Sequence, residues 1–353
     1  MTLDTLIIGG GISGLSSAFR LAREGMKVAV LERDVLGMEA SWAGGGILSP
    51  LLPWNYAAPI NQLCHHSAQL YPQWIDEIRT HSDTNPEYWP CGMQVLLPFD
   101  DPNLLRWTSA TDEATYPGFS ISLTDTGSLW LPNIAQVRNP RLISALREAL
   151  TTLGVTVLEH SGTTRLIFSP NSTAIQHVES VHGNHQAGAY LVCGGAWSQQ
   201  MLADAPPTKT ITPVRGQMLL FRTTTDTLKH IIYYKGTYLI PRRDGHLLVG
   251  STLEYVGFDK STTEEAKNKL MEQAFFLLPA LRSATLEKHW SGLRPGSPDN
   301  IPTIARHPHT SNLYIDAGHF RYGVTMAATS SQIIADLISH RTPGLDVAPY
   351  AWG

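Results

Sequence analysis

Three glycines near the start of the chain have the spacing of a dinucleotide-binding loop. Gly9, Gly11 and Gly14 fit the pattern G-x-G-x-x-G, and Glu32 follows at the end of the next apolar run. The first glycine allows a sharp turn, the second lets the backbone approach a diphosphate, and the third lets a helix pack closely on a strand. A carboxylate at Glu32 can accept hydrogen bonds from ribose hydroxyls and would repel a 2′-phosphate, so the pattern disfavours NADP.

The elements around this loop must place it at the edge of a sheet. Residues 3–8 are short, mostly apolar and rich in β-branched types, which predicts a strand. Residues 13–23 carry apolar side chains at helical spacing, and Gly25 can end that helix. Residues 27–31 form a second β-prone run. This order of strand, glycine turn, helix and strand predicts a Rossmann-like unit, but it does not separate NAD from FAD.

Composition excludes several classes of protein. The chain has 353 residues, of which 42% are hydrophobic, and a formal net charge of −4. The length suggests about two domains, and the acidic balance argues against a nucleic-acid binder. No apolar run is long enough to predict a membrane span. The three cysteines predict neither a disulfide framework nor a metal site. A strand follows Met1 almost at once, without the pattern of a secretory signal, so we expect a cytoplasmic protein.

Four later segments carry a resemblance to a known family. The segments are 33–50, with S-W-A-G-G-G-I-L at 41–48; G-G-A-W-S at 194–198; S-G-L-R-P at 291–295; and D-A-G-H-F-R-Y-G-V at 316–324. Together with the first strand, loop and helix, they resemble the D-amino-acid-oxidase-like FAD-dependent oxidoreductases. Within that family they are most similar to the glycine oxidase branch. The resemblance runs through nearly the whole chain, in the order that the family shows.

The resemblance implies an α/β fold in which two domains are interleaved along the chain. A Rossmann-like FAD-binding domain would comprise residues 1–50, 135–205 and 290–353. A smaller α+β substrate-binding domain with an antiparallel sheet would comprise residues 51–134 and 206–289. The sequence itself predicts helices at 60–79, 139–153, 262–278 and 323–339, and strands at 155–158, 218–221, 231–234, 238–240 and 246–249. Asp244-Gly245 predicts a hairpin, and Ser261 or Thr262 an N-terminal helix cap.

The cofactor that the resemblance implies is FAD. Small residues in the second glycine-rich segment would let backbone amides reach the flavin edge and the diphosphate. The N–H groups that open the last helix, at Gly323 and Val324, would stabilise negative charge on the flavin as it is reduced. The cofactor-binding candidates are Gly9, Gly11, Ile12, Ser13, Gly14, Glu32, Arg33, Ser41, Ala43, Gly44, Gly45, Gly46, Ile47, Thr163, Gly195, Trp197, Arg294, Arg321, Tyr322, Gly323 and Val324.

The substrate-binding candidates suit an amino acid held beside a flavin. The planar fork of an arginine can bind a carboxylate through two parallel hydrogen bonds, and the family pattern places Arg294 in that role. Tyr238, Arg321 and Leu253 complete the candidate pocket. Leu253 and Tyr322 depart from the glycine oxidase pattern, where Met and Asn are frequent, and this leaves the identity of the substrate open. Hydride transfer from a neutral amine needs no dedicated general base, so none is assigned.

The resemblance implies oxidation of glycine, sarcosine or a small D-amino acid to an imine, with hydrolysis of the imine and reduction of O₂ to H₂O₂. In the family this reaction often feeds thiazole formation in thiamine synthesis. Two alternatives stay open: a D-amino-acid dehydrogenase with another electron acceptor, and a flavin-binding protein without turnover. Family members are often oligomeric, so a homo-oligomer is also an alternative to a monomer.

Overall fold

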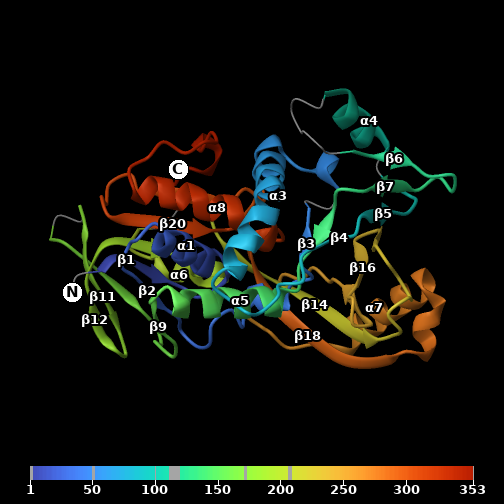
Figure 1. The fold of residues 1–353 in the computed structure, drawn as a ribbon, viewed down its shortest axis with the longest axis horizontal. Helices are drawn as coiled ribbons and strands as arrows, with labels where there is room; N and C mark the ends of the chain where they lie inside the picture. The colour runs from blue at the N-terminus through green and yellow to red at the C-terminus, as the bar shows by residue number, and fades with distance from the viewer. Residues whose placement is uncertain are drawn as a thin grey trace.

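A computed structural model describes residues 3–49, 52–99, 101–110, 120–170, 173–205 and 209–352. Two large sheets dominate it, one at each end of the molecule in the view of Figure 1. The six-stranded sheet lies with helices α1, α5 and α8 on one side of the picture, and the eight-stranded sheet lies with α7 on the other. The long helix α3 stands between them. A cleft between two such layers can bind a cofactor against one layer and a substrate against the other.

The six-stranded sheet has the order β19-β20-β13-β1-β2-β9 and is parallel except for β19. Strand β2 is a continuous buried apolar run, and β20 is buried along its whole length, as expected of a parallel sheet covered on both faces. Its strands are β1 (Leu3–Ile8), β2 (Val28–Leu31), β9 (Thr156–Leu158), β13 (Ala187–Val192), β19 (Thr303–Arg306) and β20 (Leu313–Ala317). The carboxyl ends of β1, β13 and β20 therefore lie side by side at one edge.

Three helices pack together around this sheet. They are α1 (Ile12–Arg23), α5 (Asn139–Thr152) and α8 (Gly323–Ile338), and α1 contacts both of the others. Helix α3 (Ala58–Arg79) packs on α8. Helices α1 and α8 begin directly after the loops that follow β1 and β20. Both helix N-termini consequently lie near the carboxyl edge of the sheet, where a positive dipole end favours an anion.

The eight-stranded sheet has the order β18-β14-β17-β16-β15-β5-β7-β6, and all its pairs are antiparallel except β15 with β5. Its strands are β5 (Met93–Val95), β6 (Ser122–Leu123), β7 (Leu129–Leu131), β14 (Thr212–Arg222), β15 (Ile231–Tyr234), β16 (Thr237–Pro241), β17 (His246–Gly250) and β18 (Thr285–Gly296). Helix α7 (Glu264–Leu277) covers β14, β16 and β17. The long pair β14–β18 reaches from this sheet toward the first one (Figure 1).

Smaller elements connect and flank the two large sheets. One three-stranded sheet joins β3, β8 and β4, and the other joins β10, β11 and β12. The remaining elements are α2 (Ala40–Ala43), β3 (Ile47–Leu48), β4 (Trp89–Pro90), α4 (Asp101–Ala110), β8 (Ala135–Gln136), β10 (Arg165–Phe168), β11 (Ile175–Ser180), β12 (Gly183–His185) and α6 (Ser198–Met201). Among the described helices, none combines the length and the apolar character that crossing a membrane requires.

The predicted α/β architecture is confirmed, with a parallel sheet and a separate antiparallel one. The predicted hairpin at Asp244-Gly245 joins β16 to β17. The predicted helix cap, Ser261 or Thr262, was one or two residues early, because the Thr263 side chain accepts from Ala266 N. Strand β18 was not predicted, since it is polar and contains Pro295, which suits a sheet edge.

The predicted domain boundaries stay predictions. Strand β18 runs continuously across the predicted boundary between residues 289 and 290, and β14 pairs with both halves of it. The predicted boundaries after residues 50 and 205 touch positions that lie outside the described residues.

Candidate active site

The two large sheets meet at a cleft with about 1160 Å³ of empty space, counting the open solvent at its mouth. One wall consists of the carboxyl ends of β13 and β20 and the first residues of α1 and α8. The other wall comes from β14, β16 and β18. Sixteen of the predicted site residues line it: Gly11, Ile12, Ser13, Ser41, Ala43, Gly44, Gly45, Gly46, Ile47, Gly195, Tyr238, Arg294, Arg321, Tyr322, Gly323 and Val324.

The three glycines of the first loop have different surroundings. Gly9 has a φ of +110°, and a Cβ there would lie 2.3 Å from the carbonyl oxygen of Cys193. A Cβ on Gly14 would lie 1.9 Å from the carbonyl oxygen of Gly9, so this glycine lets α1 pack on β1. A Cβ on Gly11 would meet only Ser41 Oγ, at 3.2 Å, and Gly11 alone of the three lines the cleft. Gly9 and Gly14 therefore build the turn, and Gly11 leaves its open side to a ligand.

Glu32 stabilises the glycine turn from behind. Its Oε2 accepts from Gly10 N at 2.7 Å, and its Oε1 accepts from Asp34 N at 2.9 Å. Burial raises the pKa of this carboxyl, and the two backbone N–H groups oppose that effect. Glu32 is not among the cleft-lining residues. Its predicted contact with ribose stays a prediction, which its remaining lone pairs permit.

A buried arginine that the sequence analysis missed supports the second glycine-rich loop. Arg242 is 5% exposed and donates to the carbonyl oxygens of Gly45 at 2.8 Å and Val137 at 2.9 Å. It also donates to Gln136 Oε1 at 2.5 Å. Burial lowers the pKa of Arg242 to about 10. The hydrogen bonds fix the loop at Gly45, whose backbone lines the cleft.

Arg294 lies on β18 with its guanidinium in the cleft. Its Nη2 donates to Ser251 Oγ at 2.6 Å, and its Nη1 donates to the carbonyl oxygen of Thr252 at 3.1 Å. A Cβ on Gly216 would lie 2.2 Å from Nη2, so that glycine makes room for the guanidinium. Burial lowers the pKa of Arg294, and the neighbouring Tyr238 opposes this effect. Among the residues that the structure describes, no carboxylate pairs with Arg294. A desolvated guanidinium in this state is suited to binding an anionic ligand.

Three further predicted residues lie around Arg294. Tyr238 is 8% exposed, and its ring packs against Gly45 and Gly250, where a Cβ would meet it. The Arg321 guanidinium stacks on the Phe320 ring, with 5.5 Å between its Cζ and the ring centroid. The Tyr322 ring packs edge-on against Tyr56, 5.2 Å between centroids, and burial raises the pKa of Tyr322 well above its usual value. Tyrosines therefore form one side of the candidate substrate pocket.

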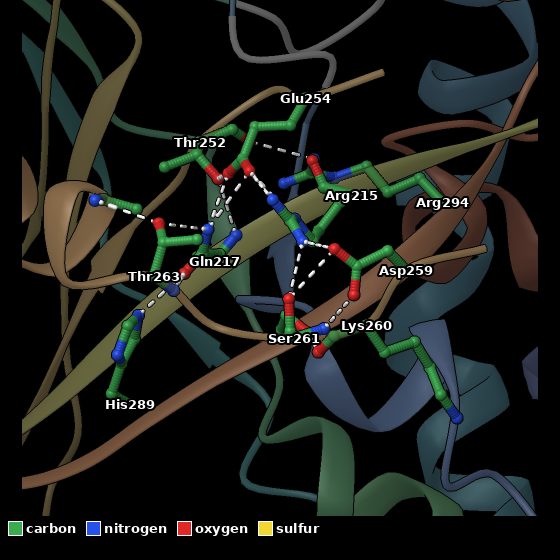
Figure 2. Close-up of polar contacts among 12 residues, drawn as sticks. Arg215, Gln217, Thr252, Glu254, Asp259, Lys260, Ser261, Thr263, His289 and Arg294 are labelled. Carbon is green, nitrogen blue, oxygen red and sulfur yellow. Dashed lines mark hydrogen bonds and ion pairs between the residues drawn. The ribbon is translucent and has the colours of Figure 1, made fainter. Parts of the chain in front are cut away.

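A network of charged groups holds the residues that contact Arg294 (Figure 2). Arg215, on β14 and 4% exposed, donates to Glu254 Oε2 at 2.9 Å and to Asp259 Oδ2 at 2.6 Å. Gln217 Nε2 donates to Glu254 Oε1 at 2.9 Å, and the Thr252 hydroxyl donates to the same oxygen. Burial raises the pKa of Glu254, but the hydrogen bonds from Thr252, Arg215 and Gln217 outweigh it and lower that pKa. The segment from Ser251 to Asp259 is thereby fixed against β14, beside Arg294.

We expect the substitution Arg215→Met to raise KM for the amino acid that the sequence resemblance implies as substrate about tenfold and to change kcat much less. The change leaves Glu254 without its cation, which releases the segment at Thr252 that accepts from Arg294. Steady-state kinetics on flavin-replete protein measures the split between KM and kcat. A matched control is Arg222→Met. Arg222 lies at the exposed end of β14, whereas Arg215 lies on its buried part, and it pairs with Glu287 of β18. An unchanged KM, or an equal loss in the control, would contradict the positioning role.

Seven predicted site residues do not line the cleft: Gly9, Gly14, Glu32, Arg33, Thr163, Trp197 and Leu253. Arg33 and Trp197 contact each other instead, with the guanidinium Cζ 4.3 Å from the ring centroid. Thr163 is exposed, and Leu253 is 42% exposed. Leu253 thus does not line the cleft, although the preceding Thr252 contacts Arg294, and its predicted role in the pocket stays a prediction.

The structure also places residues in the cleft that the sequence analysis did not select: Ala40, Ser49, Asn139, Cys193, Gly216, Met218, Ser251, Gly292, Pro295, Asp316, Ala317, His319 and Phe320. Several of them lie within the family motifs at 291–295 and 316–324. Membership of these motifs is the sequence signal from which they could have been selected. Asn139, Gly216 and Met218 lay in no motif. Asn139 Nδ2 donates to the carbonyl oxygen of Ser41 at 2.8 Å, a contact between residues far apart in the chain.

Comparisons with known proteins agree with this geometry. The family model described as FAD dependent oxidoreductase matches residues 4–337. The chain belongs to this family of FAD-dependent oxidoreductases. It is 38% identical to a glycine oxidase of Pseudomonas putida, over 99% of this chain and 98% of that protein. It is 34% identical to a bifunctional protein ThiO/ThiG of Synechocystis sp., over 96% of this chain but 52% of that protein. The crystal structure of glycine oxidase from Geobacillus kaustophilus superposes with a TM-score of 0.89, at 25% identity and over 100% of this chain and 98% of that one.

The cleft fits the flavin cofactor that the family uses, and the predicted cofactor is confirmed by the family match. Gly11 presents open space at the N-terminus of α1, where a diphosphate can approach the backbone. Gly323 and Val324 present the N-terminus of α8 to the same cleft. Asn139 Oδ1 and both carboxylate oxygens of Asp316 are buried in the cleft lining without hydrogen-bond partners among the described residues. Such groups call for a polar ligand.

Proposed function

We propose that this FAD-dependent oxidoreductase catalyses the oxidative deamination of glycine or a related small amine. The observation that carries the proposal is the Arg294 guanidinium, desolvated in the flavin cleft and held by Ser251 and Thr252. A protein that only stored flavin would not need a cation at this place. The names of the relatives support glycine as the substrate. Tyr238 and Tyr322 both lie close to the Arg294 guanidinium, which leaves space for a small substrate.

The residues of the chain would act by binding and orientation. Arg294 would bind the substrate carboxylate through two parallel N–H···O bonds. The Tyr238 hydroxyl would hydrogen-bond the same carboxylate, and Arg321 would hold either the carboxylate or the flavin. With the acid end fixed, the amine-bearing carbon faces one direction only, which supplies the positioning that such a reaction needs. When bound, FAD would supply the two-electron oxidation of the amine to an imine that water hydrolyses; Arg294, Tyr238 and Arg321 would hold the substrate in place for it.

The remaining residues would stabilise charge and exclude water. The N–H groups of Gly323 and Val324 would face the negative charge that develops on the flavin during reduction, where the N-terminus of α8 also favours it. The neutral amine would bind, so no side chain has to act as a general base. Met218 and Tyr238 are both buried and form the apolar floor of the pocket.

We propose O₂ as the electron acceptor, with H₂O₂ as its product, and thiazole formation for thiamine as the metabolic use. The relative named ThiO/ThiG supports the second point, since a chain similar to this one forms half of it. A cytoplasmic location and a homo-oligomer complete the proposal. The alternative function, a dehydrogenase with another electron acceptor, requires the same carboxylate-binding Arg294. It differs only in the molecule that receives the electrons.

One experiment separates these functions. Purified protein is mixed anaerobically with glycine, sarcosine or D-alanine while the flavin absorbance is followed, and peroxide is then measured in air with and without an artificial acceptor. We expect glycine to bleach the flavin and air to restore it with release of peroxide. Bleaching without peroxide would favour the dehydrogenase. A flavin that none of these amines bleaches would overturn the proposal of an amine-oxidising enzyme.

A further inference from the structure

A buried carboxylate in the cleft is the strongest feature that the proposed reaction does not use. Asp316 lies near the carboxyl end of β20, lines the cleft and is 1% exposed. Neither of its oxygens has a hydrogen-bond partner among the described residues. A buried carboxylate in this condition is costly, since it has lost its water without gaining donors. Such a group calls for a partner, and a ligand in the cleft can supply it.

The one charged contact of Asp316 does not satisfy it. His319 Nε2 lies 3.2 Å from Asp316 Oδ1, but it also lies 3.0 Å from Ser330 Oγ. A single N–H at Nε2 cannot point at both acceptors. Whichever way that N–H points, Oδ2 is left without a donor. The carboxylate therefore has room for at least one hydrogen bond from a molecule in the cleft.

Asp316 lies between the glycine turn after β1 and the first residues of α8. Strands β20 and β13 pair in parallel with Ile315 opposite Val192, so Asp316 lies beside Cys193. The carbonyl oxygen of Cys193 in turn contacts the turn at Gly9. On the other side, the Cβ of His319 would lie 3.5 Å from a Cβ on Gly323, the first residue of α8. Asp316 is thus placed between the diphosphate loop and the helix that would face the flavin ring.

FAD carries several donors, including flavin N3–H and the hydroxyls of the adenosine ribose, but only the ribityl hydroxyls lie between the diphosphate and the flavin ring. The diphosphate is anionic and would be repelled by the carboxylate. The flavin edge near N1 and C2=O offers acceptors, which a carboxylate cannot serve. The ribityl chain joins these two parts and carries hydroxyl groups that donate. We propose that Asp316 binds the ribityl hydroxyls of FAD. The inference rests on the proposed placement of the diphosphate at Gly11.

The test compares two ligands that share the diphosphate but differ in the ribityl chain. Apoprotein is titrated with FAD and with ADP by calorimetry, for the unchanged protein, Asp316→Ala and Asp316→Asn. We expect Asp316→Ala to weaken FAD binding about 10- to 100-fold, which is the range for a hydrogen bond to a charged group, and to leave ADP binding unchanged. Asp316→Asn, which keeps one acceptor oxygen, is expected to lose less. Asp226→Ala, at a carboxylate whose side chain is 85% exposed, is the matched control and should change neither affinity.

A second titration uses FAD analogues that lack one ribityl hydroxyl. An analogue missing the contacted hydroxyl binds the unchanged protein more weakly than FAD does, but it shows no such deficit with Asp316→Ala. Equal losses of ADP and FAD affinity, or an unchanged FAD affinity, would overturn the assignment. Because both titrations measure binding and not turnover, they are decided separately from the proposed oxidation of glycine.

Discussion

Arg294→Ala is expected to lower kcat/KM for glycine by about 30- to 5,000-fold. The range corresponds to about 2–5 kcal/mol, the usual loss when one member of a desolvated charge pair is removed. In the unchanged protein the guanidinium is already fixed by Ser251 and Thr252, so little freedom is lost when the carboxylate binds. Alanine leaves the substrate carboxylate without its cationic partner in the cleft. The measurement is steady-state kinetics at matched flavin content.

Two further variants separate charge from shape. Arg294→Lys keeps the positive charge but loses the planar fork, and we expect it to recover only part of the lost kcat/KM. Arg165→Ala removes an arginine whose side chain is 71% exposed, and it should leave the kinetics unchanged. Since Arg294 is also a cofactor-binding candidate, flavin content is measured from the visible absorbance of each variant. Unaltered kinetics in flavin-replete Arg294→Ala would remove this residue from the substrate site.

Gly11→Val is expected to give a folded protein without FAD. The new Cβ meets only Ser41 Oγ within 4 Å, and it lies on the side of Gly11 where we place the diphosphate. Helix α1 and strand β1 keep their packing, because Gly9 and Gly14 are unchanged. The ratio of visible to ultraviolet absorbance after purification measures bound flavin, and circular dichroism measures the fold.

Two glycine variants serve as controls for Gly11→Val. Gly344→Val adds the same side chain where a Cβ would meet nothing within 4 Å, and it should stay yellow. Gly14→Ala should lose the fold itself, since its Cβ would lie 1.9 Å from the carbonyl oxygen of Gly9. If purified Gly11→Val carries a full complement of flavin, the loop does not hold the diphosphate where we place it.

Local patterns were sufficient to predict much of the fold. Helix α1 and strands β1 and β2 follow directly from apolar spacing and from the glycines between them. The hairpin between β16 and β17 follows from two residues, Asp244 and Gly245. These patterns involve residues that are close together in the sequence, so they can be recognised without knowing the tertiary structure.

Contacts between distant parts of the chain were not predictable in the same way. Arg242 binds the loop at Gly45, nearly two hundred residues away, and no local pattern marks a buried arginine. Strand β18 lacks an alternating apolar pattern because it is an edge strand, and it was found only as the motif around Arg294. The family motif did select Arg294, while the Arg215 network that supports it is visible only once β14 and the segment after β17 are side by side.

The cleft takes its lining from both halves of the polypeptide, from Gly11 near one end to Val324 near the other. A cut in the exposed turn at Asp226 would leave the diphosphate loop on one fragment and the guanidinium of Arg294 on the other. Neither fragment alone could enclose an isoalloxazine ring, and reassembly would restore the yellow colour. The protein is thus a natural starting point for a split reporter whose signal is its own pigment.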